Sequence, residues 1–238
     1  SVPRSVEDPI GTTEVNIRGT LSMLIAARDA GVKRFVFSSS SSVYGNTPVL
    51  PKREDMPPGP LSPYALQKLT GEYYCRVFWR LYGLRTFCLR YFNVYGPRQN
   101  PASQYAAVVP RFITSLKKSR PMVIYGDGSQ TRDFTFVEDV AAANLACCAA
   151  SEAGAGETYN VAGGRRISVN DLAGALMRIM GRTVEPQHEA ERPGDVRDSL
   201  GDISRAQSAL GWAPRVSLDE GLARTVSYLS GIEGDPEA

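Results

Sequence analysis

The sequence predicts an α/β fold, in which a parallel sheet is covered by helices. Short apolar runs typical of buried strands alternate with longer segments whose apolar residues recur at helical spacing. Glycines and prolines separate these segments, as expected for turns between elements. Strands that alternate with helices in this way pair in parallel rather than as hairpins. The 238 residues are enough for one large domain or two small ones.

The first part of the chain supplies two of the expected strands. The run Arg34-Phe35-Val36-Phe37 leads into five serines, which predicts a short buried strand that ends in hydroxyl groups. Gly31 and Gly83 each follow a helical pattern and are expected to end a helix. In chain order we expect a loop over 1–11, a helix over 12–30, a strand over 33–38, a loop over 47–60, a helix over 63–82 and a strand over 84–91.

The rest of the chain continues the alternation with shorter strands. Ser168 precedes a helical pattern and Asp171 follows at the third position, which is a capping-box arrangement. Residues 183–202 are mixed and polar, and we assign no element to them. We expect helices over 106–118, 138–150, 168–180, 203–210 and 218–229, strands over 123–125 and 158–161, an extended segment over 134–137, and a frayed tail over 231–238.

Composition argues against several classes of function. The net charge is +2 and no basic stripe indicates a nucleic-acid partner. No segment is long and apolar enough to span a membrane, and residues 1–8 lack a signal-peptide hydrophobic region. The four cysteines form no C-x-x-C pair and lie far from the only histidine, so we expect no metal site and buried free thiols in a reducing cytoplasm: Cys75, Cys88, Cys147 and Cys148.

Tyr64 and Lys68 are the candidates for proton transfer. They are four residues apart, so on a helix they share one face. A free phenol has a pKa of about 10, and a neighbouring cation such as Lys68 would lower it. A serine at the end of the preceding strand could hydrogen-bond the same substrate oxygen. The alternative is that Tyr64 packs in the core and Lys68 faces solvent, but the serine-rich strand end and Ser62-Pro63 favour a site.

Two arginines in loops are candidates for binding a diphosphate. Arg132 and Arg192 carry guanidinium groups, which pair well with phosphate oxygens. Spacing alone favours solvated loop charges instead. His188 has no visible partner, and we expect it to be structural or exposed. The helices over 12–30 and 63–82 are apolar over wide faces. Such faces could pack both on the sheet and on a second subunit, and the alternative is that they are buried within one chain.

Five motifs occur in one order along the chain: F-S-S-S-S-S-V-Y-G at 37–45, S-P-Y-A-L-Q-K at 62–68, L-R-Y-F-N-V-Y-G-P-R at 89–98, I-Y-G-D-G-S-Q-T-R-D-F at 124–134 and R-P-G-D at 192–195. With these motifs the chain resembles the extended short-chain dehydrogenase/reductase family, in its NAD-dependent epimerase/dehydratase branch. It is most similar to UDP-N-acetylglucosamine 4-epimerases and UDP-glucose 4-epimerases, from Ser1 to about residue 230.

The resemblance implies a role for each matching position. The catalytic residues would be Ser40, Tyr64 and Lys68. NAD would be bound by the same three residues together with Asn16 and Phe92. The UDP-sugar substrate would contact the positions that match the family's sugar, uracil, ribose and diphosphate contacts: Ser41, Ser42, Asn93, Val108, Val123, Tyr125, Arg132, Arg192, Asp195 and Ser199.

The resemblance also implies a division of the chain. A Rossmann-like doubly wound parallel sheet that binds NAD would comprise residues 1–93 and about 134–163. A smaller α/β region that binds the nucleotide-sugar would comprise about 94–133 and 164–230, followed by a tail over 231–238. The family begins with a strand and a glycine-rich turn for the cofactor, and this sequence has no such pattern. We therefore expect a fragment or a truncated gene product, whose activity alone is in question.

The implied reaction is inversion at C4 of a UDP-hexose. Tyr64 would remove the proton of the 4-hydroxyl while NAD accepts the hydride, and the 4-keto sugar would turn before the hydride returns. Ser199 stands where a large side chain excludes an N-acetyl group in these epimerases, so a small residue there favours UDP-N-acetylglucosamine and UDP-N-acetylgalactosamine. A cytoplasmic homodimer is expected from the family, with no nucleic-acid or membrane partner.

Two other functions remain open on the same scaffold. Nucleotide-sugar dehydratases and decarboxylases place Asp or Glu directly after the catalytic hydroxyl residue, whereas Ser41 and Ser42 follow Ser40 here. The missing cofactor turn would suit a non-catalytic nucleotide-binding remnant. Such remnants usually lose the tyrosine or the lysine, and both are present in this chain.

Overall fold

The computed structural model describes residues 1–100, 107–191 and 196–231 of the chain. Its central element is a parallel sheet of three strands in the order β1 (Arg34–Ser40), β2 (Arg85–Tyr91) and β7 (Glu157–Val161). The register places Ser40 beside Tyr91, and Tyr91 beside Val161. The three carboxyl ends therefore lie at one edge of the sheet, and the serines of β1 are part of that edge.

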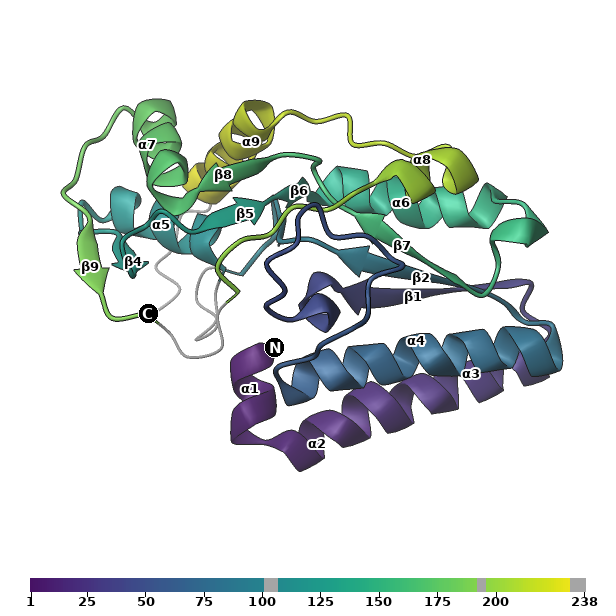
Figure 1. Ribbon diagram of the computed structural model, residues 1–238. Helices are drawn as coiled ribbons and strands as arrows, with labels where there is room; N and C mark the ends of the chain where they lie inside the picture. The colour runs from purple at the N-terminus through teal and green to yellow at the C-terminus, as the bar shows by residue number, and fades with distance from the viewer. Residues whose placement is uncertain (101–106, 192–195, 232–238) are drawn as a thin grey trace.

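Helices cover both faces of this sheet. Helices α3 (Gly19–Asp29) and α4 (Pro63–Tyr82) lie on one face, and α6 (Val137–Ala149) and α8 (Ser204–Leu210) lie on the other (Figure 1). Buried apolar side chains on each face fill the space between helices and strands. The predicted fold class, a Rossmann-like α/β fold with a parallel sheet, is therefore confirmed.

A second group of elements gathers beyond one end of the sheet (Figure 1). Three helices pack around a separate apolar core: α5 (Val108–Lys117), α7 (Val169–Met180) and α9 (Leu218–Gly231). Three pairs of short strands accompany them: β3 (Val94–Tyr95) with β6 (Thr135–Phe136), β4 (Val123–Tyr125) with β9 (Gln187–Glu189), and β5 (Thr131–Asp133) with β8 (Arg166–Ser168).

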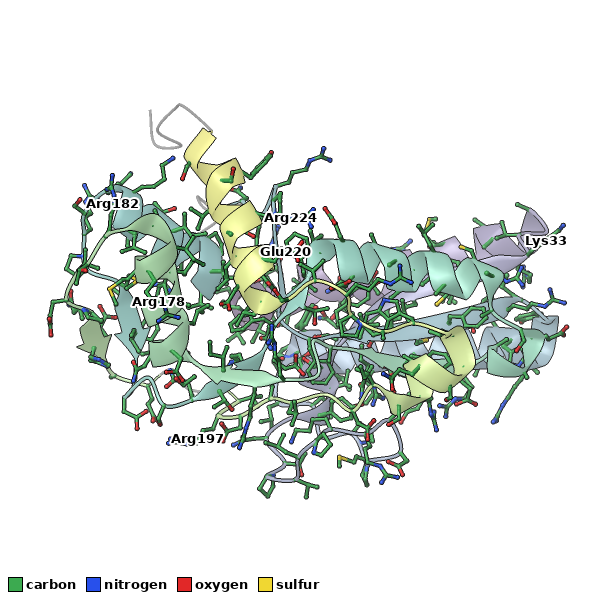
Figure 2. The ribbon with its side chains drawn as sticks, turned by 90° about the horizontal axis from the view of Figure 1, so that it is seen from above. Lys33, Arg178, Arg182, Arg197, Glu220 and Arg224 are labelled. Carbon is green, nitrogen blue, oxygen red and sulfur yellow. The ribbon has the colours of Figure 1, made fainter. Side chains whose placement is uncertain are left out.

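Charged side chains of this second group contact neighbouring helices, among them Arg182 and Arg224, which are labelled in Figure 2. Arg182, just after α7, donates to the carbonyl oxygens of Leu116 and Lys117 at the end of α5, each over 2.8 Å. Arg224 of α9 pairs with Glu138 of α6. A cation near the carboxyl end of a helix complements the helix dipole, so the Arg182 contact stabilises the end of α5.

The predicted loop over 1–11 is wrong. Those residues form α1 (Val2–Glu7) and most of α2 (Pro9–Thr13), which continue through a π-helical segment, η1 (Glu14–Arg18), into α3. Ser1 and Asp8 cap the two short helices by accepting backbone N–H groups. The prolines stand in the first helical turn, where the absent N–H costs nothing.

The ends of the long helices follow the predictions. Ser62 caps α4 by accepting the backbone N–H of Ala65, and Gly83 ends it in a left-handed conformation with a φ of 67°. Ser168 caps α7 by accepting the backbone N–H of Asp171. Two short 3-10 segments, η2 (Ser41–Tyr44) and η3 (Glu152–Gly154), complete the described elements.

Three strands had no predicted counterpart, namely β5, β8 and β9, because short polar strands are defined by their partners rather than by an apolar pattern. The thiol prediction needs one correction: the four cysteines are free, but Cys148 is exposed. In the part of the chain that the structure describes, none of the helices has the length and apolar character needed to cross a membrane.

Candidate active site

The candidate site lies where β1 ends and α4 begins. In open α/β sheets, ligands bind at the carboxyl ends of the strands. The last residue of β1, Ser40, turns the chain into η2: its Oγ accepts hydrogen bonds from the backbone N–H of Ser42 over 3.2 Å and from the Ser42 hydroxyl over 2.9 Å. Ser41 and Ser42 lie in η2, beside Ser40.

Helix α4 carries Tyr64 and Lys68 to this strand end. Lys68 Nζ donates to the carbonyl oxygen of Ser38 over 2.8 Å and lies 5.6 Å from the centre of the Tyr64 ring. The Tyr64 phenol interacts with the Ser40 hydroxyl. The backbone N–H of Tyr64 donates to Ser5 Oγ over 3.0 Å, so α1 contacts the first turn of α4. The three predicted catalytic side chains are therefore neighbours.

The electrostatics of this group differ from the prediction. Burial raises the pKa of Tyr64, and the hydrogen bond with Ser40 opposes that effect only in part. Burial lowers the pKa of Lys68. The prediction that Lys68 brings the Tyr64 pKa below its ordinary value is therefore wrong for the protein without ligands, because desolvation of the phenolate outweighs the stabilising interactions.

Asn93 and Ser199 come together at the end of β2. Asn93 has a φ of 28°, and its Nδ2 donates to the Asp133 carbonyl oxygen over 2.8 Å and to Ser199 Oγ over 3.2 Å. Ser199 Oγ also accepts the backbone N–H of Asp133 over 3.1 Å, and the serine is 8% exposed. Two predicted substrate positions, 106 residues apart, are thus in direct contact.

The Asp133 carboxylate links its own segment to two others by hydrogen bonds. Its carboxylate accepts the backbone N–H of Gly163 over 2.7 Å and that of Gly201 over 3.0 Å. Burial raises the pKa of Asp133 to about 6. The sequence analysis missed this residue, although its place directly after Arg132 in the fourth motif could have indicated it.

The remaining predicted substrate residues lie in the second group of elements. Arg132 Nη1 donates to the carbonyl oxygens of Thr131 and Arg197, so backbone groups hold its guanidinium in place. Val108 begins α5, and Val123 and Tyr125 lie on β4. Arg111, which the sequence analysis missed, lies over the Tyr125 ring at 5.4 Å from its centre. Arg192 and Asp195 lie outside the described residues.

The predicted cofactor residues Asn16 and Phe92 lie in different surroundings. Asn16 lies in the π-helical segment, and its Nδ2 donates to Gln67 Oε1 over 2.7 Å. Gln67 in turn donates to the hydroxyls of Thr12 and Thr13, which makes it a buried link between α2 and α4 that the sequence analysis missed. Phe92 is fully buried and its backbone N–H donates to the Val161 carbonyl oxygen over 3.0 Å, so its contact with NAD stays a prediction.

The residues at the strand end fit the nicotinamide half of NAD. Lys68 uses one N–H for Ser38, and an ammonium group has three donors, so it can also hold ribose hydroxyls. Ser40 and Tyr64 lie beside it with hydroxyl groups that can meet a substrate oxygen. His188, for which the sequence indicated no partner, is exposed, and its Nδ1 lies 2.7 Å from the Gly126 carbonyl oxygen, away from this group.

Comparison with known proteins agrees with this geometry. The model of the NAD dependent epimerase/dehydratase family matches residues 1–162. The UDP-glucose 4-epimerase of Mycolicibacterium smegmatis is 44% identical over 229 residues, which are 96% of this chain and 72% of that protein. The dTDP-D-glucose 4,6-dehydratase of Mus musculus is 34% identical over 224 residues, which are 91% of this chain and 61% of that protein.

Solved structures give the same result. The UDP-N-acetylglucosamine 4-epimerase from Methanobrevibacter ruminantium in complex with UDP-N-acetylmuramic acid has a TM-score of 0.93 and 38% identity, covering 97% of this chain and 73% of its own. The UDP-glucose 4-epimerase of Thermotoga maritima with UDP-glucose has a TM-score of 0.93 and 41% identity, covering 97% and 74%. The UDP-glucose 4-epimerase of Thermus thermophilus in complex with NAD has a TM-score of 0.89 and 37% identity, and the match covers 98% of this chain and 75% of that chain.

Proposed function

The chain belongs to the NAD-dependent epimerase/dehydratase family, and from this premise we propose that it inverts the configuration at C4 of a UDP-sugar. One observation carries the proposal above all: Ser40, Tyr64 and Lys68 meet at the carboxyl end of β1, although the chain between Ser40 and Tyr64 makes a long irregular loop. A base, a hydroxyl donor and a cation at one point are what proton transfer at a sugar hydroxyl requires.

Each residue then has a defined task. Tyr64 takes the proton from the 4-hydroxyl and later returns it, while the Ser40 hydroxyl holds the same oxygen. Lys68 binds the nicotinamide ribose and supplies positive charge near the phenol. NAD, when bound, would supply a reversible hydride acceptor for C4 and would not be consumed in a turnover. Arg132 and Asn93 hold the diphosphate while the sugar turns.

We propose UDP-N-acetylglucosamine and UDP-N-acetylgalactosamine as the substrate pair. The support is Ser199, a small residue whose hydroxyl is hydrogen-bonded to the Asn93 side chain and to the backbone N–H of Asp133. On the same proposal, the sheet with residues 1–93 and about 134–163 binds NAD, and about 94–133 with 164–230 binds the nucleotide-sugar. The free thiols are typical of a reducing compartment, which favours the cytoplasm.

An epimerisation assay tests the proposal. The chain is incubated with NAD and UDP-N-acetylglucosamine, and UDP-N-acetylgalactosamine is measured by chromatography beside the Tyr64→Phe variant. We expect conversion that falls by a factor of about a thousand or more in the variant, since the base is removed. Conversion that survives the substitution would contradict the role of Tyr64.

Two other outcomes separate the alternatives. Bound NAD without conversion of either UDP-N-acetylglucosamine or UDP-glucose would count against epimerisation, and a 4-keto-6-deoxy product would indicate a dehydratase. If the chain neither converts a substrate nor retains NAD, the result would favour a nucleotide-binding remnant.

We further propose a homodimer that is formed through α3 and α4. Both helices keep large apolar side chains exposed on the side away from the sheet: Met23, Ile25, Leu66, Tyr73, Val77, Leu81 and Tyr82. Apolar side chains gathered on two adjacent helices are typical of an interface. A second copy of the same two helices would bury them in a four-helix arrangement.

A further inference from the structure

Helix α4 contacts the end of β1 at three successive turns. Tyr64 interacts with the Ser40 hydroxyl, and Lys68 donates to the Ser38 carbonyl oxygen. One turn later, Glu72 Oε1 accepts a hydrogen bond from the Ser39 hydroxyl over 2.5 Å. Residues four apart lie on one face of a helix, so the two catalytic candidates and Glu72 face the same strand.

Glu72 is also bonded to the neighbouring strand. Arg90 of β2 donates to both carboxylate oxygens of Glu72, from Nε over 2.9 Å and from Nη2 over 2.7 Å. The side chains are 6% and 5% exposed, which makes this a buried bidentate ion pair. The pair therefore joins the helix to two strands directly behind the catalytic edge of the sheet.

The network continues to the third strand. The Arg90 guanidinium lies over the ring of Tyr44, 4.6 Å from its centre. The Tyr44 hydroxyl donates to Asn160 Oδ1 on β7 over 2.7 Å. A network of charged and hydrogen-bonded side chains thus links α4 to β1, β2 and β7. On β1 and β2 its members come shortly before Ser40 and Asn93 in the sequence.

Stability alone does not account for a pair of this kind. Burying two charges is costly, and well-packed apolar residues of similar volume often stabilise a fold as much or more. A bidentate carboxylate–guanidinium contact instead fixes distance and orientation. The packing beside it tolerates little freedom, because a Cβ on Gly71 would lie 2.3 Å from the Phe37 ring.

We propose that Glu72 and Arg90 are positioning residues for the catalytic group. They hold α4 at the distance from β1 that brings Tyr64 to Ser40 and Lys68 to Ser38, and the Ser39 hydroxyl transmits that position to the strand. The inference rests on the proposed function for its effect on turnover, but its geometric part applies to the chain without ligand.

A double substitution separates positioning from stability. Glu72→Met with Arg90→Met removes both charges and keeps the volume, so we expect thermal unfolding close to that of the unmodified chain. We expect kcat to fall by about 10- to 100-fold with KM changed less than threefold, because small misplacements of reacting groups cost rates of that order. The matched control is Arg85→Gln with Glu152→Gln, an exposed pair at the other end of β2.

The second measurement needs no turnover. The chain is labelled with 13Cζ-tyrosine, and the Tyr64 resonance is assigned with Tyr64→Phe and titrated without ligand. In the unmodified chain and in the control, we expect the pKa of Tyr64 to lie above that of a free phenol, because the phenol is buried. In the double variant we expect the pKa of Tyr64 to fall toward that of a free phenol, because a helix that is no longer held exposes the phenol.

The outcomes are distinct. A stable double variant with unchanged kcat and unchanged Tyr64 titration would overturn the inference and leave the pair structural. If the double variant does not fold, Ser39→Ala takes its place, because it removes only the hydroxyl that joins Glu72 to β1, and the same two outcomes apply. If the unmodified chain has no epimerase activity but the double substitution still shifts the Tyr64 titration, the result would contradict the proposed function and support the positioning role.

Discussion

Two buried side chains near the end of β2 can be tested by single substitutions. Ser199 is small, buried and hydrogen-bonded to Asn93, and we proposed it as the position that selects the substrate. Asp133 is a buried carboxylate that is held by backbone N–H groups of two other segments. Each of these residues leads to a prediction about a point substitution.

We predict that Ser199→Tyr narrows the substrate range. The larger side chain would occupy the space beside Asn93, so conversion of UDP-N-acetylglucosamine should fall at least about tenfold relative to UDP-glucose. The ratio of kcat/KM for the two substrates, measured in the same variant, cancels any general loss from the disturbed hydrogen bonds. An unchanged ratio would show that position 199 does not select the substrate.

We predict that Asp133 makes stability depend on pH. Its folded pKa of about 6 lies above the ordinary value of 3.8, so the folded state binds the proton more tightly than the unfolded state does. The free energy of unfolding should therefore fall as the pH rises from about 4 to about 6, by about 3 kcal/mol, and then level off. Asp133→Asn should remove this slope in urea titrations, whereas Asp219→Asn, at an exposed carboxylate, should keep it.

At the scale of elements, the contact between α4 and β1 matters most. The helix begins at a serine cap, ends at a left-handed glycine and approaches the strand closely at Gly71. On this face of the helix, Lys68 and Glu72 are hydrogen-bonded to Ser38 and Ser39 of β1. A bulkier residue at 71 would push the helix away from the strand.

We predict that Gly71→Ala destabilises the protein and reduces turnover. The added Cβ meets the Phe37 ring at 2.3 Å, and overpacking of this kind costs about 1–3 kcal/mol. Gly174→Ala on α7 is the matched control: its Cβ meets only the flexible Arg178 side chain at 3.6 Å, and alanine should gain up to about 1 kcal/mol there. Denaturant unfolding of both variants checks the prediction, and equal effects would contradict it.

At the scale of the whole molecule, the two groups of elements have separate apolar cores, and the predicted substrate residues are divided between them. The predicted catalytic residues belong to the sheet and its helix α4, and the residues predicted to contact the uracil and the diphosphate belong mostly to the other group. Helices α3 and α4, which carry the exposed apolar side chains, lie on the opposite face of the sheet from α6 and α8 (Figure 1).

We predict that these faces form the contact between two copies of the chain. Tyr73→Glu with Val77→Glu places two charges on the exposed side of α4 and should convert a dimer to a monomer in light scattering. Leu145→Glu, at an exposed apolar residue on α6, should leave the dimer intact. A monomer in the unmodified chain would contradict the proposed interface.

The sequence by itself determined the elements with strong local signals. The apolar run into five serines, the caps at Ser62 and Ser168 and the glycines after the helices are local features, so β1, α4 and α7 could be predicted closely. The spacing of Tyr64 and Lys68 on one helical face is local as well. Proline content misled us over 1–11, because proline suits the first turn of a helix as well as a loop.

Only the tertiary structure decided the contacts between distant segments. The strand pairing of β5, β8 and β9, the contact of Asn93 with Ser199, and the Glu72–Arg90 pair depend on partners far along the chain. The net direction of the Tyr64 pKa was decided in the same way. The spacing to Lys68 is visible in the sequence, but desolvation follows from everything packed around the phenol.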